Sequence, residues 1–243
     1  MKIIIVKNPK EVGVKAAGLV FKDIKKKKNL VLGLATGRTM IPFYKNLVKV
    51  INNRETSTNN IRTFNLDEYV GLSFGDKRSL RYFMEKNFFS KVDIPEENIH
   101  FLDGKAKNLD LECTKYEREI KNAGGIDLQI LGIGRDGHIG FNEPNSSFNS
   151  KTREIVLKEI TRKDNSRYFS SLKKFPQKAL TMGVGTIMSA KKIILLAFGK
   201  GKAEIIHRVL HGKVSKNFPA SVLQKHRDVT FILDKGAASE FGI

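Results

Sequence analysis

The stretch "IDLQILGIG", residues 126–134, decides the fold expected for this chain. It is a short, almost continuous apolar run that ends in glycines, and such a run is typical of a strand in a parallel sheet with both faces covered. Similar runs recur along the chain, at residues 2–6, 29–35, 61–66, 191–199 and 228–233. Helix-like stretches separate them. We therefore predict an α/β fold, with a mostly parallel, Rossmann-like sheet covered by helices on both faces.

The stretches between these runs have the period and the end signals of helices. Helices are expected over about 9–27 and 79–87, from a start near Thr39, and over about 202–210. No linker rich in Pro, Gly or Ser divides the chain, and no internal repeat is visible. Residues 1–243 are accordingly predicted to form a single domain.

The composition is that of an ordinary globular protein, with 40% hydrophobic residues. The longest apolar runs, such as "IILLAF" at 193–198, have the length of strands, so no membrane span is expected. The start "MKIIIVKN" resembles a first strand more than a signal peptide. The single cysteine, Cys113, excludes an internal disulfide and suits a reducing compartment, so we expect a cytoplasmic protein.

The net charge of +19 is the unusual bulk feature. Such a field attracts polyanions, and nucleic acid is one candidate partner. However, the lysines are scattered along most segments, and no nucleic-acid-binding motif accompanies them. We therefore do not expect a nucleic-acid partner. The same field would also attract a small phosphorylated metabolite.

Four polar clusters follow predicted strands directly. They are "ATGRT" (35–39), "LDEYVGL" (66–72), "GRDGHIGFNEP" (134–144) and "GKGKAE" (199–204). Ligands of open parallel sheets bind beyond the carboxyl ends of the strands. The sequence therefore predicts one site at one edge of the sheet.

The first and last clusters could bind an anion. Amides and hydroxyls at a helix start form such a site, here from Thr36, Gly37, Arg38 and Thr39. The spacing is not that of a P-loop, and an ordinary turn with Thr39 as the helix N-cap explains it equally well. Lys202 and Arg167 could add a point charge and a planar fork for a phosphate, although solvent exposure is the default for either.

The two middle clusters carry acid–base groups. Asp67 and Glu68 stand together at a strand end, and Asp136, His138 and Glu143 lie within eight positions among glycines. A histidine linked to carboxylates can move protons near neutral pH. Such a set could also bind zinc or iron, but the spacing matches no metal motif, and no metal is expected.

Taken together, these motifs resemble the glucosamine-6-phosphate deaminases of the glucosamine/galactosamine-6-phosphate isomerase family. The resemblance rests on "LGLATGRT", "FNLDEYVGL", "LGIGRDGHIGFNEPNSSFNSKTR", "ALTMGVGTIMSAKKIILLAFGKGKAE" and "VTFILDKGAAS", and it covers nearly the whole chain in order. The related 6-phosphogluconolactonases are not expected to carry both "DEYVGL" and "DGHIGFNEP". The resemblance implies conversion of D-glucosamine 6-phosphate and water to D-fructose 6-phosphate and ammonia, with no cofactor.

The resemblance also implies roles for the residues. His138, held by Asp136 and Glu143, would open the sugar ring. Asp67 would move the C2 proton to C1. The turn at 36–39, Arg167 and Lys202 would bind the phosphate, beneath a lid at about 157–180.

One part of the family pattern is missing. The allosteric, hexameric members bind N-acetylglucosamine 6-phosphate through a serine-rich loop and an "RIK"-like segment, and they carry a longer C-terminal tail. This chain keeps Ser146, Ser147 and Arg153, but Ile155 stands where those members place a lysine, and the sequence stops at Ile243. We therefore expect little or no activation by that sugar and a monomer or small homo-oligomer, not a hexamer.

Three alternatives remain from the sequence. The chain could be a lactonase or another sugar-phosphate isomerase or hydrolase on the same fold, or a non-catalytic sugar-phosphate-binding domain. Retention of all the acid–base residues favours an enzyme.

Overall fold

The computed structural model describes residues 1–159, 161–162 and 175–241. Its main feature is a seven-stranded sheet with the order β1-β10-β9-β6-β2-β3-β5. Every neighbouring pair of these strands is parallel. The strands are β1 (Lys2–Val6), β2 (Val31–Leu34), β3 (Arg62–Asn65), β5 (Ile99–His100), β6 (Leu128–Leu131), β9 (Lys192–Ala197) and β10 (Val229–Asp234). All six predicted runs form strands of this sheet.

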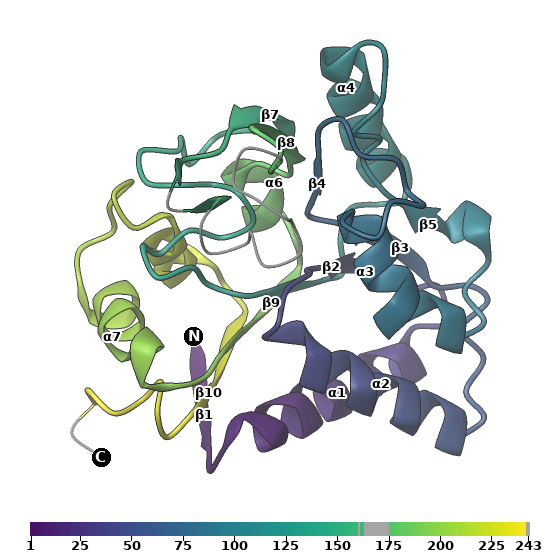
Figure 1. The fold of residues 1–243 in the computed structure, drawn as a ribbon. Coiled ribbons are helices and arrows are strands. Elements are labelled where there is room, and N and C mark those ends of the chain that lie inside the picture. Colours follow the sequence, from purple (N-terminus) through teal and green to yellow (C-terminus); the bar gives the residue numbers. More distant parts are fainter. Residues whose placement is uncertain (160, 163–174, 242–243) are drawn as a thin grey trace.

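Helices cover both faces of the sheet. Figure 1 shows α1 and α2 on one side of β9, β10 and β1, and α7 on the other. The helices are α1 (Pro9–Lys26), α2 (Met40–Asn53), α3 (Leu80–Asn87), α4 (Leu109–Asn122), α6 (Val184–Met188) and α7 (Ala203–His211). Short 3-10 turns are η1 (Phe89–Lys91), η2 (Glu96–Asn98), η5 (Lys200–Lys202) and η6 (Pro219–Lys225). The prediction of a parallel, Rossmann-like α/β fold is confirmed.

The helices begin where the sequence supplies caps. The Asn8 side chain accepts the Glu11 N–H at the start of α1, with Pro9 in the first turn, and Ser79 caps α3 through the N–H of Tyr82. In α4 the buried residues are Cys113, Tyr116 and Ile120, which follow helical spacing along one face. None of the described helices is long and apolar enough to cross a membrane.

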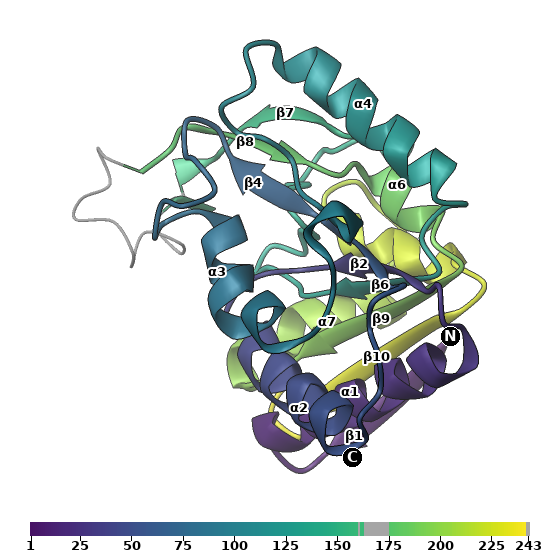
Figure 2. The ribbon, with the colours of Figure 1, turned by 90° about the vertical axis from the view of Figure 1, so that its right-hand side faces the viewer.

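A second, smaller sheet carries part of the site. It is antiparallel, in the order β4-β8-β7, and consists of β4 (Asp67–Tyr69), β8 (Lys178–Thr181) and β7 (Arg153–Val156). Its register places Asp67, Thr181 and Arg153 in one row across the three strands. Figure 2 shows this sheet between α3 and α4, beyond the end of the central sheet. A separate apolar cluster, including Tyr69, Phe141, Phe175 and Ala179, packs beside it.

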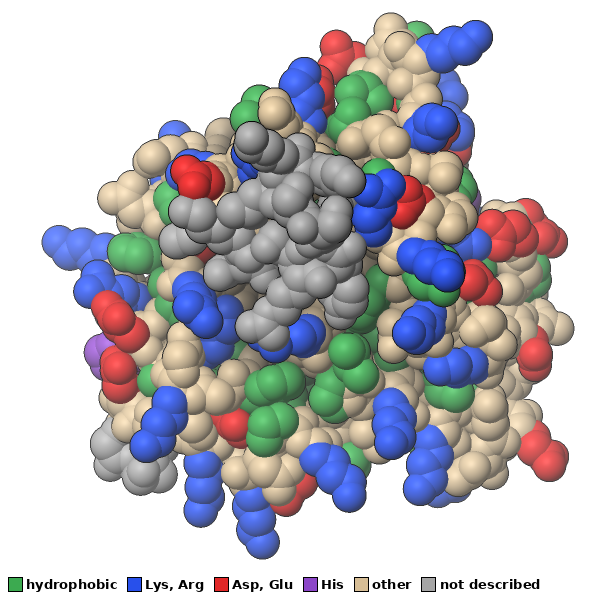
Figure 3. Space-filling view, viewed as in Figure 1, with side chains coloured by type: hydrophobic (Ala, Val, Ile, Leu, Met, Phe, Trp, Pro, Cys, Tyr) green, Lys and Arg blue, Asp and Glu red, His purple; other side chains and the backbone are tan. Residues whose placement is uncertain are grey.

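The surface agrees with the scattered charge of the sequence. On the face shown in Figure 3, Lys and Arg side chains are spread over the protein with Asp and Glu among them. No single basic patch dominates the described part of that face. The high net charge therefore acts as a general field there, without a localised basic footprint.

Candidate active site

The carboxyl ends of β9, β6, β2 and β3, which are neighbours in the sheet, bring the four predicted clusters to one edge. Contacts join them. The Lys202 ammonium, after β9, donates to the carbonyl of Ile133, after β6, at 2.7 Å. The loop after β6 reaches β4 at Gly140, and the Leu66 N–H donates to the carbonyl of Leu34 at the end of β2.

Asp67 is a buried carboxylate of this site without a described hydrogen-bond donor. It starts β4, its exposed fraction is 6%, and none of the described residues donates a hydrogen bond to its carboxylate. Burial, and secondly the charge of Glu68, raises the pKa of Asp67 from 3.8 to about 8. A buried carboxylate without a partner is a strong base, because protonation relieves its desolvation.

Gly140 is the point where the loop carrying His138 approaches Asp67. Its φ of +57° lies in the left-handed region, and a Cβ there would be 3.5 Å from Asp67 Oδ2 and 3.1 Å from Thr181 Oγ1. The Phe141 N–H donates to Thr181 Oγ1 at 3.1 Å, which ties the loop to β8. Glycine thus keeps a gap free beside the carboxylate.

Asp136 and His138 form the predicted pair. His138 Nδ1 lies 2.6 Å from Asp136 Oδ1, and the His138 backbone N–H donates to the same oxygen. The imidazole lies against Gly134, where a Cβ would be 2.2 Å from Nδ1. Burial opposes ionisation of Asp136, but the hydrogen bonds and charge of His138 outweigh it and lower the pKa of that carboxyl. The pair fixes Nδ1 as the donor and leaves Nε2 to accept a proton.

Glu143 makes a different set of contacts. It is buried, and it accepts the Lys158 N–H at 3.2 Å and the hydroxyl of Thr161. No hydrogen bond joins it to His138. In this structure Glu143 therefore ties the loop after β6 to the segment after β7, and among the described side chains Asp136 is the one that hydrogen-bonds the His138 ring.

The residues predicted to bind the phosphate lie at the start of α2 and after β9. Gly37 has φ +98°, and it and Arg38 are exposed, whereas Thr36 and Thr39 are half-buried. Thr39 occupies the N-cap position but makes no side-chain capping bond, so its hydroxyl is not used by the helix. Lys202 reaches the same edge from η5. Arg167 and most of the expected lid lie outside the described residues.

Arg153 and Ile155 have structural contacts in β7. Arg153 Nη1 donates to Asn142 Oδ1 at 2.9 Å, and the Asn142 amide donates to the carbonyls of Ile139 and Met182. Ile155 pairs with Ala179 and packs on the smaller apolar cluster. Asn142 thus connects the loop after β6 to β7 and to the residue that follows β8.

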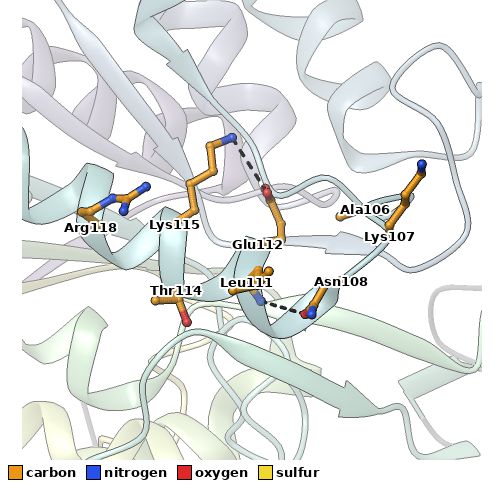
Figure 4. A pocket seen from close by; sticks show the side chains of 8 residues that line it. All are labelled: Ala106, Lys107, Asn108, Leu111, Glu112, Thr114, Lys115 and Arg118. Atoms are coloured by element: carbon orange, nitrogen blue, oxygen red, sulfur yellow. Dashed lines mark hydrogen bonds and ion pairs between the residues drawn. The ribbon is translucent and has the colours of Figure 1, made fainter.

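Two cavities lie elsewhere. One of about 480 Å³ is lined by Ala106, Lys107, Asn108, Leu111, Glu112, Thr114, Lys115 and Arg118 (Figure 4). There Asn108 caps the Leu111 N–H and Lys115 pairs with Glu112, so these groups serve the start of α4. The other, of about 240 Å³, lies beside His100 and Glu119. None of the predicted site residues lines either cavity. Among the residues that the structure places, no group of three His, Cys, Asp or Glu could hold a metal ion.

The burial of Asp67 gives a testable cost in stability. The folded pKa is raised, so the folded chain binds this proton more tightly than the unfolded chain, and stability falls as pH rises from about 4 to about 8. We expect Asp67→Asn to unfold with a free energy larger than wild type by about 2 kcal/mol or more at pH 8, and by little at pH 4. Denaturant titrations at both pH values measure this. A constant difference across the range, or no difference from the exposed control Asp110→Asn, would contradict it.

Known proteins with similar sequences identify the family of this chain. The profile of the family described as Glucosamine-6-phosphate isomerases/6-phosphogluconolactonase matches residues 10–232. The chain belongs to this family. The glucosamine-6-phosphate deaminase of Thermoanaerobacter sp. (strain X514) is 53% identical over 239 residues, which are 98% of this chain and 94% of the relative. That of Clostridium botulinum (strain Loch Maree / Type A3) is 48% identical over 243 residues, the full length of both chains.

Solved structures of the glucosamine-6-phosphate isomerase/6-phosphogluconolactonase family share the fold. A monomeric glucosamine-6-phosphate deaminase superposes with a TM-score of 0.96 at 45% identity, covering 98% of this chain and 99% of that one. The 6-phosphogluconolactonase from Trypanosoma cruzi has a TM-score of 0.78 at 21% identity, covering 100% of this chain and 97% of that one. At that identity the second likeness concerns the fold alone.

The sequence alone did not point to two residues of the candidate site. Thr181 accepts from the loop beside Asp67, and Asn142 accepts from Arg153. Glu68 was singled out from the sequence beside Asp67, but its contact with the start of α3 was not. The other contacts join residues that are 11 or 40 positions apart, so the folded chain alone reveals them.

Proposed function

We propose that this chain is a glucosamine-6-phosphate deaminase, which converts D-glucosamine 6-phosphate and water to D-fructose 6-phosphate and ammonia. The observation that carries the proposal is Asp67, a buried carboxylate without a described partner, next to the loop that holds the Asp136–His138 pair. This reaction needs a base for a carbon-bound proton and a separate group for the ring oxygen. The site offers one of each.

The first step is opening of the ring. His138 Nε2 takes the proton of the anomeric hydroxyl and returns it to the ring oxygen, while Asp136 holds Nδ1 and stabilises the imidazolium. Asp67 then removes the proton from C2 while O1 gains a proton, which gives an enolamine, and Asp67 delivers its proton to C1 to leave an imine at C2. Water adds to this imine, and the resulting carbinolamine loses ammonia to give the ketone of fructose 6-phosphate. Glu143 assists from the same loop when its carboxylate is released from Lys158 and Thr161.

The phosphate is assigned to the turn of Thr36, Gly37, Arg38 and Thr39, with Lys202 and Arg167. Free amides and hydroxyls at a helix start favour a dianion, and the Lys202 charge stands at the same edge. Anchoring this remote group orients the reacting carbons. Residues 157–180, including Arg167, are proposed as a lid over the bound sugar.

An assay of released ammonia tests the proposal. Purified protein with D-glucosamine 6-phosphate should release ammonia and form fructose 6-phosphate in equal amounts, and it should not hydrolyse 6-phosphogluconolactone. Lactone hydrolysis without ammonia release would indicate the lactonase. Sugar-phosphate binding with neither reaction would indicate a binding domain.

We further propose a cytoplasmic monomer or small homo-oligomer without sugar activation. Ile155 offers no charge to a second phosphate, and its side chain is packed against the cluster around Ala179. We expect N-acetylglucosamine 6-phosphate to leave the half-saturating substrate concentration unchanged within about twofold. Saturation curves with and without it decide this, and a clear fall in half-saturation contradicts it. Sedimentation measures the subunit number.

A further inference from the structure

Two adjacent carboxylates of β4 have opposite surroundings. Asp67 faces Gly140 and receives no hydrogen bond from the described residues. Glu68 is fully buried, and its carboxylate accepts three backbone N–H groups, from Tyr69 at 2.8 Å, Leu80 at 3.0 Å and Arg81 at 2.8 Å. Successive side chains of a strand point to opposite faces, so one strand holds a free acid on one side and a bound acid on the other.

The three donors favour the ionised form of Glu68. Both of its oxygens accept from amides, and these hydrogen bonds are stronger to a carboxylate than to a carboxylic acid. Two of the donors belong to the first turn of α3, where a negative charge is favoured. Burial raises the pKa of Glu68 to about 7, and these amides oppose the rise. None of the described residues donates to Asp67 in this way, so we expect Glu68 to be the member of the pair that ionises first.

We propose that Glu68 is a positioning residue of the deaminase: its amide-bound carboxylate fixes β4 to the start of α3 and places a negative charge beside Asp67. This inference rests on the proposed function, because it concerns the base of that reaction. The anchor sets where Asp67 stands relative to Gly140. The charge keeps Asp67 a stronger base than an isolated carboxylate, as removal of a carbon-bound proton requires.

Other groups around the pair do not replace this charge. The phenols facing Asp67 are Tyr44, Tyr69 and Tyr116, whose pKa values burial raises further above the neutral range, so they remain uncharged. On the loop side stand Asp136 and His138, which pair with each other, and Glu143, which is bound to Lys158 and Thr161.

The charged groups near Glu68 are also engaged. The Arg81 guanidinium binds Glu96 at 2.7 Å and Glu85 at 3.3 Å, and Asp76 forms an ion pair with Arg78. Glu68 meets Arg81 only through its backbone N–H. None of the described Lys or Arg side chains therefore forms an ion pair with the Glu68 carboxylate.

The experiment compares pH profiles of kcat/KM for ammonia release in wild type, Glu68→Gln, Glu68→Asp and the control Glu96→Gln. The acid limb of kcat/KM reports groups of the free enzyme and the free substrate. The substrate amine titrates identically with every variant, so a difference between variants belongs to the protein. Glu96 binds the same Arg81 from an exposed position, and its loss should leave the limb unchanged.

In Glu68→Gln the negative charge is lost, so Asp67 ionises at lower pH and the acid limb should move down by about one pH unit. Glu68→Asp keeps the charge but cannot span to both amides of α3. The acid limb of its kcat/KM profile should stay at the pH of wild type, while its kcat falls about tenfold because β4 is less well anchored. A merely structural role would lower activity in both variants without moving the limb. An unmoved limb in folded Glu68→Gln overturns the proposal.

Thermal melts establish that each variant is folded. If Glu68→Gln does not fold, carbon-13 NMR of the wild-type carboxyl groups decides: as pH falls, Asp67 must gain its proton before Glu68, and the reverse order overturns the proposal. The wild-type assay separates the two hypotheses. Wild-type protein that releases no ammonia refutes the proposed function, whereas active wild type with an unmoved limb in Glu68→Gln refutes only the role of Glu68.

Discussion

Asp67→Asn should lower ammonia release about 10³-fold or more, because it removes the only buried carboxylate described at this edge without a hydrogen-bond partner. Asparagine has nearly the same shape, so the neighbouring Gly140 and Thr181 need not move. The loss should therefore appear in kcat, and KM should change little, since the phosphate contacts lie elsewhere. Initial rates of ammonia release at saturating D-glucosamine 6-phosphate measure it.

The control for this variant is Asp110→Asn, an exposed acid in the first turn of α4. It should keep wild-type activity. Exchange of the C2 proton with deuterium from solvent gives a second readout, because Asp67→Asn should abolish exchange as well as turnover. Full activity in Asp67→Asn, or exchange that persists without turnover, would assign the proton transfer to another group.

His138→Gln should lower turnover about 10²- to 10³-fold by preventing ring opening. Glutamine cannot take up and return a proton at Nε2, although it can still donate toward Asp136, which lies 2.6 Å from Nδ1 in wild type. An open-chain amino-alditol phosphate needs no ring opening, so its inhibition constant should stay within about threefold of wild type. Steady-state rates and inhibition together test this.

The matched control is His207→Gln, an exposed histidine of α7 that contacts His211. It should be fully active. A large loss of affinity for the open-chain analogue in His138→Gln would mean that the histidine binds substrate and does not open the ring. The companion variant Asp136→Asn should lower turnover less, because it only releases the orientation of the imidazole.

The central sheet could be predicted because its strands are buried on both faces. Strand β6, for example, has all four of its residues buried, so the apolar run at 126–134 by itself indicates a strand that is covered on both faces. The common edge of the four clusters followed from the parallel arrangement. The nature of the chemistry followed from the resemblance, since no spacing by itself distinguishes a deaminase from another sugar-phosphate enzyme.

The smaller sheet could not be predicted in this way. Strand β4 reads "DEY", which is polar, yet all three residues are buried because Tyr69 packs on Phe141 and Glu68 finds amides of α3. Those partners lie 12 or more positions away. Helix α4 was also missed, although Cys113, Tyr116 and Ile120 follow helical spacing, because most of its sequence is polar.

The Asp136–His138 pair and the Asp67 carboxylate belong to different segments of the chain. Asp136 and His138 are two positions apart within one loop, whereas Asp67 starts a strand of the smaller sheet. On the roles proposed above, the group that opens the sugar ring and the group that moves its carbon-bound proton are therefore held by different parts of the fold. Among the described residues they meet at Gly140, at Thr181 and where Tyr69 packs on Phe141, so these contacts set the alignment of two groups that could otherwise change independently.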